Sequence, residues 1–486
     1  MENSDSYKKI LSKTKIIFGG VVLSGLLLWC IFFFTNQFSI PSWFIIGLPV
    51  FVALTVILSF LNDTIIITAI FFTLAYPYRL TISIGPLNSF SITEITLALF
   101  LSVLLWRFAL RRTILGQKSC DLQQHFRVEV LDLAIFLYLS FNLLSFFWAY
   151  QFDLALRGII PILENVFLYY LIVYFARNWP RTRYVSLLFL GLGVFAVILS
   201  AIFFFGRLDF LDIIPPQDAI SLASVRARLG SPAWGRSNYF ATAMLLFLPA
   251  YLAFAMLSKS LKKRLLFCAI IIGSFVVFLF TWSRGGYIGL AGGIIALLAV
   301  SLKKRKFSIC SIVVIAIIVI LLAGVIVPMV LHFSHINTLD SVGYNRIFKV
   351  DDSNIKIRLY TWRKIWNYVQ SNVLGVGIGN AQTVGQNIIQ NVHNAYLQVL
   401  LETGSVGLAI FILLLALMLR KNWQLIRKME NNAYSPLALG LFASFVAILI
   451  NIGGEASFEG VVFGWLFWIT QGLVRAFSLQ TASPTK

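Results

Sequence analysis

"VHNAYLQVLLETGSVGLAIFILLLALMLR", residues 392–420, joins a polar cluster to an unbroken apolar run. The polar part contains His393, one of only four histidines in the chain. The apolar part extends to Arg420 and is long enough to cross the roughly 30 Å hydrocarbon core of a membrane. The stretch therefore predicts a membrane helix with a polar cluster at its mouth.

Similar apolar runs recur along the whole chain, which is 59% hydrophobic with a mean hydropathy of +0.87. Because lipid-exposed backbone must satisfy its own hydrogen bonds, the spans are predicted to be helices. We expect an all-α polytopic membrane protein with about 12 to 14 transmembrane helices, forming a single membrane domain over residues 1–486. The candidate spans are residues 16–34, 43–60, 64–77, 93–110, 131–149, 158–176, 185–205, 237–257, 264–282, 286–301, 308–330, 395–419, 434–452 and 459–475. Two short ones, 43–60 and 64–77, are candidates for re-entrant segments.

The net charge of +20 is best explained by membrane topology. If the basic N-terminus is cytoplasmic, alternation of the spans places most Lys and Arg on the cytoplasmic side, as the positive-inside rule requires. Both termini are then cytoplasmic, and the basic charge suits anionic membrane lipids and implies no nucleic-acid partner. The basic N-terminal stretch is interpreted as leading into the first span and not as a removed signal peptide.

Metal and disulfide chemistry have little support in the sequence. The four cysteines contain no C-x-x-C pair. His332 and His335 form an H-x-x-H pair without an evident third ligand. We therefore expect no metal and no cofactor.

Two outer segments are long enough to carry function, an arginine loop at 206–236 and a large loop at 331–394. Within the second, residues 355–370 have apolar residues at helical spacing and predict a helix at the outer membrane interface. Its apolar face is predicted to contain Ile355, Leu359, Trp362, Trp366 and Val369. "GVGIGN" (375–380) follows as a glycine-rich loop, and a nucleotide site there is disfavoured because no strand precedes it.

Basic residues on the predicted outer side need an explanation other than topology. Arg226 and Arg228 lie in the arginine loop, Arg284 precedes two glycines at the start of a span, and Arg358 lies on the interfacial helix. Arginines and a helix N-terminus together suit an anionic ligand such as a diphosphate. The alternative is that these arginines reach lipid headgroups or pair with acidic residues such as Glu455.

The sequence leaves two geometries open for His393. A straight helix from His393 to Arg420 would be about 40 Å long and would place the imidazole about 10 Å beyond the hydrocarbon core. Alternatively, "TGSVG" breaks the helix and residues 393–402 pack over the site. In either case the imidazole lies at the depth of lipid phosphates and suits a general base, although a capping role is also open.

Several polar residues are candidates for supporting roles around the base. Asn394, Tyr396 and Glu402 follow His393 in the chain. Glu164 lies inside a predicted span, where carboxylates are functional candidates, although it could instead pair with Arg157. Glu455 flanks the last predicted span on the outer side.

These residues together resemble the O-antigen ligase and polymerase superfamily. The resemblance rests on "HNAYLQVLLETGSVGLAIF" after a large outer loop, with "TWSRGGYIGL", "RLGSPAWGRSNYFA" and "IRLYTWRKIW". It is best between about residues 220 and 420.

The resemblance implies a GT-C-like, metal-independent membrane glycosyltransferase in the bacterial cytoplasmic membrane. Such enzymes use glycans carried on undecaprenyl diphosphate at the outer face, in cell-wall and polysaccharide biosynthesis that includes teichuronic acid. Carried over, His393 would activate the acceptor hydroxyl, and Arg226 or Arg228 with Arg284 would bind the diphosphate. Arg358 would be a further arginine near the diphosphate.

The favoured function is a polymerase that joins lipid-linked repeat units to an acceptor glycan. The first alternative is a ligase that transfers the glycan to a lipid A core. An anion transporter is a third reading, because some relatives are described as bicarbonate transporters, and a non-catalytic scaffold in an export complex is a fourth. A chain-length regulator or a flippase is the expected protein partner.

Overall fold

A computed structural model describes residues 53–55, 63–75, 81–83, 89–113, 128–205, 229, 234, 237–303, 353–381, 392–429, 434–455 and 461–481. The chain forms two compact units, Met1–Arg127 and Val128–Lys486, and each is described by itself. The single membrane domain expected over the whole chain stays a prediction, as do the bounds of its two outer loops.

The first unit contains two apolar helices, α3 (Asp63–Ala75) and α4 (Ile92–Thr113), which pack against each other. Between them, β1 (Thr81–Ser83) and β2 (Ser89–Ser91) pair as a short antiparallel hairpin, with Ile82 opposite Phe90. The sequence pattern did not predict these strands, because three-residue strands are too short to show an alternation of side chains.

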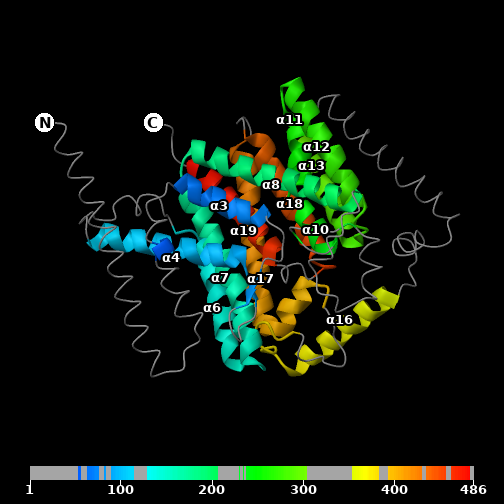
Figure 1. Ribbon diagram of the computed structural model, residues 1–486. Helices are drawn as coiled ribbons and strands as arrows, with labels where there is room; N and C mark the ends of the chain where they lie inside the picture. The colour runs from blue at the N-terminus through cyan, green and yellow to red at the C-terminus, as the bar shows by residue number, and fades with distance from the viewer. Residues whose placement is uncertain are drawn as a thin grey trace. The chain divides into compact units, whose positions relative to one another are not determined.

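The second unit is a helical bundle (Figure 1). Its elements are α6 (Val130–Leu144), the 3₁₀ turn η2 (Ser145–Trp148), α7 (Phe152–Phe175), α8 (Trp179–Phe205), α10 (Ser237–Met244), α11 (Leu248–Leu257), α12 (Leu261–Leu279), α13 (Arg284–Lys303), α16 (Ser353–Ser371), α17 (Ala395–Lys428), α18 (Ser435–Asn451) and α19 (Val461–Gln480). Within it, α17 packs against α6, α16, α18 and α19.

Seven helices in the described part of the chain are long and apolar enough to cross a membrane, and three shorter apolar helices accompany them. Each predicted span within the described residues contains a helix. The predicted spans 16–34 and 308–330 lie outside the described residues, and 43–60 does so almost entirely. The all-α polytopic membrane protein predicted from hydropathy is confirmed.

Glycines let α13 and α18 pack with their backbones close together. A Cβ on Gly289 would lie 2.8 Å from the Ala447 carbonyl oxygen, and one on Gly293 would lie 2.8 Å from the Ala447 Cβ. Small residues four apart permit this close approach of membrane helices. The two helices run in opposite directions, so the N-terminus of α13 lies beside the C-terminus of α18.

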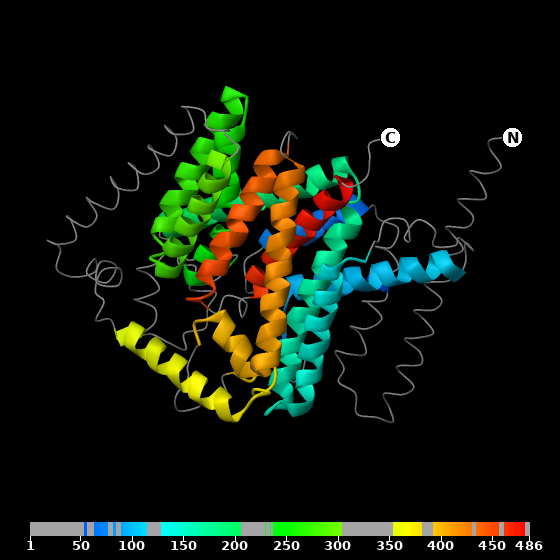
Figure 2. The ribbon, with the colours of Figure 1, turned by 180° about the vertical axis from the view of Figure 1, so that it is seen from behind.

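The helix predicted after His393 reverses direction at Gly404. Gly404 has φ 69° and ψ −170°, a conformation essentially limited to glycine, and a Cβ there would lie 1.9 Å from the Val373 carbonyl oxygen. The rings of Tyr396 and Phe411 have centroids 6.2 Å apart, whereas in a straight helix these residues would be about 22 Å apart. Figure 2 shows the first stretch of α17 folded back beside the second. Of the two geometries left open by the sequence, the broken helix is therefore the observed one.

The glycine-rich loop predicted after residue 370 supports this reversal. The backbone N–H groups of Val376 and Gly377 donate to the carbonyls of Leu401 and Glu402, at 2.9 and 2.8 Å, and so complete the end of the first stretch of α17. A Cβ on Gly377 would lie 2.3 Å from Ala149 Cα. The loop is thus packed tightly against protein backbone, which gives its glycines a structural explanation.

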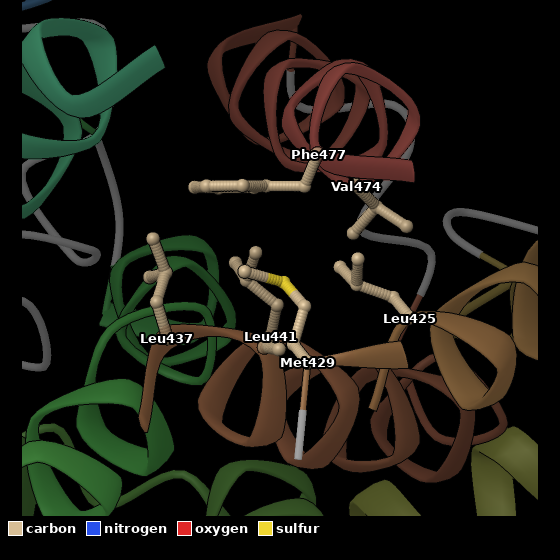
Figure 3. Packing of buried hydrophobic residues seen from close by; sticks show 7 residues of the cluster. Leu425, Met429, Leu437, Leu441, Val474 and Phe477 are labelled. Carbon is tan, nitrogen blue, oxygen red and sulfur yellow. The ribbon is translucent and has the colours of Figure 1, made fainter. Parts of the chain in front are cut away.

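At the far end of α17 a hydrophobic cluster joins three helices. Figure 3 shows its side chains, Leu425 and Met429 at the end of α17, Leu437 and Leu441 from α18, and Val474 and Phe477 from α19. All of them are at most 2% exposed. This cluster holds the end of the long second stretch of α17 against α18 and α19.

Candidate active site

His393 lies in a strained turn that connects α16 to α17. Its backbone has φ 48°, and Trp282, just before α13, has φ 51°. Such conformations are uncommon for side chains this large and cluster at functional sites. Hydrogen bonds on both sides hold the turn, because Trp362 Nε1 donates to the Val392 carbonyl at 2.8 Å and Ala395 N donates to the Ile452 carbonyl at 2.9 Å.

Glu455 is the partner of His393. The imidazole Nδ1 lies 3.3 Å from Glu455 Oε2, and the side chains are 35% and 8% exposed. Burial alone would raise the pKa of Glu455, but the hydrogen bond with His393 and the positive charge of Arg358 outweigh it and hold the pKa below its ordinary value. An ionised carboxylate accepts from Nδ1–H, and in the neutral tautomer that donates this hydrogen bond Nε2 carries the lone pair.

The other oxygen of Glu455 receives two further donors. Asn238 Nδ2, on α10, donates to Oε1 at 2.8 Å, and Arg358 Nη2, on α16, lies 3.2 Å from the same atom. Arg358 Nη1 also donates to the Gly454 carbonyl at 2.7 Å. Glu455 therefore ties together residues from two helices, α10 and α16, and the His393 turn.

The N-terminus of α13 lies against this carboxylate. A Cβ on Gly285 would lie 3.4 Å from Glu455 Cγ and 3.2 Å from Asn451 Nδ2. Ser283 Oγ accepts a hydrogen bond from Gly286 N at 3.3 Å, within the first turn. Arg284 is the first residue of this helix, and the positive end of the helix dipole lies next to the Glu455 carboxylate.

Two buried polar side chains, Thr242 and Asn451, contact each other next to the site. Thr242 Oγ1 lies 2.8 Å from Asn451 Oδ1 and 2.9 Å from the Asn238 carbonyl, one turn before it. Thr242 and Asn451 are each at most 1% exposed. This contact links α10 to α18 and fixes Asn238 against Glu455.

The predicted supporting residues next to His393 have structural contacts. Asn394 caps α17 by accepting from Leu397 N at 3.1 Å, and Tyr396 OH donates to the Leu449 carbonyl at 2.9 Å. Glu402 accepts from Gln398 Nε2 at 3.3 Å and lies about 13 Å from His393 along the helix. None of these three contacts reaches the Glu455 carboxylate, and their supporting role stays a prediction.

Glu164 lies on α7, where Trp465 Nε1 on α19 donates to its Oε2 at 3.0 Å. These two helices pack closely, because a Cβ on Gly472 would lie 2.9 Å from Ile172 Cβ. The contact gives Glu164 a place between two membrane helices. Its predicted part in the chemistry stays a prediction.

Arg226 and Arg228 of the arginine loop lie outside the described residues, and their binding to the diphosphate stays a prediction. His332 and His335 also lie outside the described residues. Within the ranges that the structure describes, no three His, Cys, Asp or Glu side chains are grouped so that they could hold a metal ion.

The helix predicted at 355–370 is confirmed as α16, but its buried side is not the predicted apolar face. Ile365, which lies outside that face, is fully buried, whereas Leu359 and Trp366, which belong to it, are each 57% exposed. Helical spacing shows which side chains share a face, but it does not show which face meets protein. That α16 lies at the membrane interface stays a prediction.

Sequence reasoning missed Asn238 and Asn451. Asn238 lies in the stretch "RLGSPAWGRSNYFA" that carried the resemblance, but the candidate predicted from that stretch was the arginine at its start, Arg228. Asn451 ends an apolar run just before "GGE", and a buried amide at that position would have been a usable signal.

Comparison with known proteins identifies the central part of the chain. Residues 268–412 match the family model described as O-antigen ligase, which confirms the resemblance to the O-antigen ligase and polymerase superfamily. No curated protein matches the chain. The matched region contains Arg284, Arg358 and His393, whereas Asn238 and Glu455 lie outside it.

Proposed function

Since residues 268–412 match the O-antigen ligase family, we propose that this membrane protein is a glycosyltransferase that moves a lipid-linked glycan onto an acceptor hydroxyl. The observation that carries the proposal is the pair of His393 and Glu455, 3.3 Å apart, beside the N-terminus of α13. This arrangement joins a base to a site suited to a diphosphate leaving group.

His393 acts as the general base. Glu455 accepts a hydrogen bond from Nδ1–H and so orients the ring, which leaves Nε2 to take the proton of the acceptor hydroxyl. A carboxylate in this position also stabilises the imidazolium that forms. The 35% exposure of the His393 side chain leaves the ring accessible to an acceptor, while Glu455 stays buried.

The acceptor oxygen then attacks the anomeric carbon of the donor sugar. The bond between that carbon and the diphosphate oxygen breaks, and the diphosphate leaves on its lipid. Arg284 and the first N–H groups of α13 stabilise the charge that develops on the diphosphate. Inversion at the anomeric carbon is what the resemblance implies.

Further details of the reaction follow from the resemblance. The carrier is undecaprenyl diphosphate, the reaction occurs at the outer face of the cytoplasmic membrane, and both termini of the chain are cytoplasmic. Arg226 and Arg228 of the arginine loop contribute to diphosphate binding. A polymerase that extends a glycan is favoured over a ligase that uses a lipid A core.

A reconstituted transfer assay tests the proposal. Wild type and His393→Ala would be purified into lipid and given undecaprenyl-diphosphate repeat units from the native host, with product size read on a gel. We expect a ladder from wild type and a loss of about 100-fold or more in His393→Ala, the range for removal of a general base. His125→Ala is the matched control, because the sequence places that histidine on the opposite side of the membrane.

The remaining outcomes separate the alternatives. A reaction that needs an added lipid A core identifies a ligase. Equal ladders from wild type and His393→Ala exclude His393 as the base. No transfer to any acceptor by folded protein that binds donor contradicts the proposed function and favours a transporter or a scaffold.

A further inference from the structure

The turn that carries Glu455 depends on contacts with neighbouring elements for its conformation. It contains Gly453 and Gly454, and a Cβ on Gly454 would have only the Asn451 carbonyl oxygen nearby, at 3.7 Å. A turn with two glycines has many accessible backbone conformations, so it does not by itself fix the direction of a carboxylate. The position of Glu455, and with it the orientation of His393, depends on neighbouring elements.

Arg358 is one of the groups that fix this turn. Nη1 donates to the Gly454 carbonyl at 2.7 Å, and Nη2 lies 3.2 Å from Glu455 Oε1. One guanidinium thus binds both the backbone and the carboxylate of the turn, and its planar fork suits such a two-point contact. The side chain is 27% exposed, which is less than for His393.

The helix that carries Arg358 is itself fixed to the His393 turn. Trp362, one turn along α16, donates to the Val392 carbonyl. Ile365, a further turn along, is buried in a cluster with Val392 and Leu401. One side of α16 therefore contacts both members of the His393–Glu455 pair. Arg358 contacts the turn that carries Glu455, and Trp362 contacts the turn that carries His393.

We propose that Arg358 is a positioning residue that acts through Glu455 on His393, and not a ligand of the donor diphosphate. This inference rests on the proposed function and changes the role that the resemblance gave to Arg358. Both terminal nitrogens of its guanidinium are engaged by the turn, whereas Arg284 begins a helix whose N-terminus suits an anion. Asn238 shares Oε1 with Arg358, so loss of Arg358 weakens the orientation of the carboxylate without removing every donor.

Two measurements test the assignment in Arg358→Gln and Arg284→Gln. The first is the Kd for undecaprenyl diphosphate in lipid nanodiscs, and the second is kcat for transfer. We expect Arg358→Gln to change the Kd less than threefold and to lower kcat about tenfold. Arg284→Gln should weaken binding about tenfold, since it removes a charge-assisted contact to the diphosphate. Arg358→Lys should recover part of kcat, and Lys364→Gln on the same helix controls for the loss of one positive charge.

A double-mutant cycle shows whether Arg358 acts through Glu455. If it does, adding Arg358→Gln to Glu455→Gln should cause little additional loss of kcat. Adding Arg284→Gln to Glu455→Gln should still weaken the Kd for undecaprenyl diphosphate by its full factor. A Kd about tenfold weaker in Arg358→Gln, or full additivity with Glu455→Gln, would overturn the assignment. The proposed function is judged separately, because it fails if wild type shows no transfer to any acceptor, and the role of His393 as the base fails if His393→Ala retains transfer.

Discussion

The two ends of α17 both carry clusters of charged residues, but the clusters are built differently. At the His393 end one buried carboxylate binds the side chains of Asn238 and Arg358 and a partly exposed imidazole. At the other end the guanidinium of Arg475 contacts both Glu129 and Asp132, and Lys421 contacts Glu129. The second cluster joins α19 and α17 to the start of α6.

Exposure separates the two clusters further. Arg475 is 3% exposed, Lys421 and Asp132 are each 12% exposed, and Glu129 is 35% exposed, so three of these four charged side chains lie mostly inside protein. Tyr170 OH also donates to Asp132 at 3.2 Å. His393, in contrast, is 35% exposed and has one ring nitrogen engaged by Glu455. Charged side chains that are buried against one another stabilise helix packing, whereas a partly exposed imidazole is accessible to a substrate.

Backbone strain also distinguishes the two ends. Trp282 and His393 are the positive-φ residues other than glycine in the described part of the chain; His393 contacts the Glu455 carboxylate, and Trp282 lies three residues before Gly285, which packs against Glu455. At the other end, α6 begins with a regular capping box between Glu129 and Asp132. Strain at one end and regular capping at the other are what a functional site and a structural anchor require.

Arg475→Met should give the largest change in stability, and it tests the structural half of this comparison. Removal of one partner from a buried ion cluster leaves Asp132 and Glu129 without their common cation, so we expect a loss of about 3 kcal/mol in the free energy of unfolding. Transfer per folded molecule should stay near that of wild type. Arg427→Met, an exposed cation in the last turn of α17, is the matched control and should change stability by less than about 0.5 kcal/mol.

The readouts are denaturant unfolding in detergent and transfer activity normalised to folded protein. If Arg475→Met lowered activity at unchanged stability, the cluster at that end would take part in function, and the comparison would be wrong.

Gly404→Ala should have the next largest effect, because it acts on the reversal that separates the two stretches of α17. A side chain there would meet the Val373 carbonyl and force a glycine-type conformation, at about 1–3 kcal/mol. The first stretch of α17 follows His393 directly, so a change at the reversal should displace the base. We therefore expect kcat to fall even in protein that remains folded. Gly273→Ala on α12 is the control, because its Cβ would enter open space and should be neutral or stabilising.

Circular dichroism with thermal unfolding, together with the transfer assay, measures both quantities. Unchanged kcat in a destabilised Gly404→Ala protein would show that the reversal does not position the base.

The helices, and His393, Arg358 and Glu455 as candidate residues, were predictable from the sequence, for physical reasons that particular residues show. Hydropathy runs predict spans because burial in lipid acts on every residue of a span. The loop geometry could not be predicted in the same way. "TGSVG" allowed either a straight or a broken helix, and the choice depends on the Gly404 contact with Val373, thirty-one residues earlier in the chain.

Pairings across the fold were the hardest to predict. Glu455 was a candidate from its place beside a span, but its contact with His393 spans 62 residues and that with Asn238 spans 217. The cluster around Arg475 was missed because its members lie at the ends of separate apolar runs, where single charges are explained by topology. Such contacts depend on which helices pack together, as α13 and α18 do through their small residues.

Lowering the pH should produce the smallest of these changes in stability. It tests the two clusters through one carboxylate in each, Glu129 and Glu455. Burial alone would raise the pKa of Glu129, but the hydrogen bond from Lys421 and the charge of Arg475 outweigh burial. The pKa of Glu129, like that of Glu455, therefore lies below its ordinary value. A lowered pKa in the folded state contributes stability at neutral pH, and that contribution is lost as the pH falls from about 5 through the folded-state pKa. Wild type should therefore unfold at lower temperature between about pH 5 and pH 3, and Glu129→Gln and Glu455→Gln should each show a shallower decline. Transfer activity at pH 7 separates the pair, because Glu455→Gln should lose most of it and Glu129→Gln should keep it. Equal activity in the two variants would mean that the two ends of α17 do not differ in function.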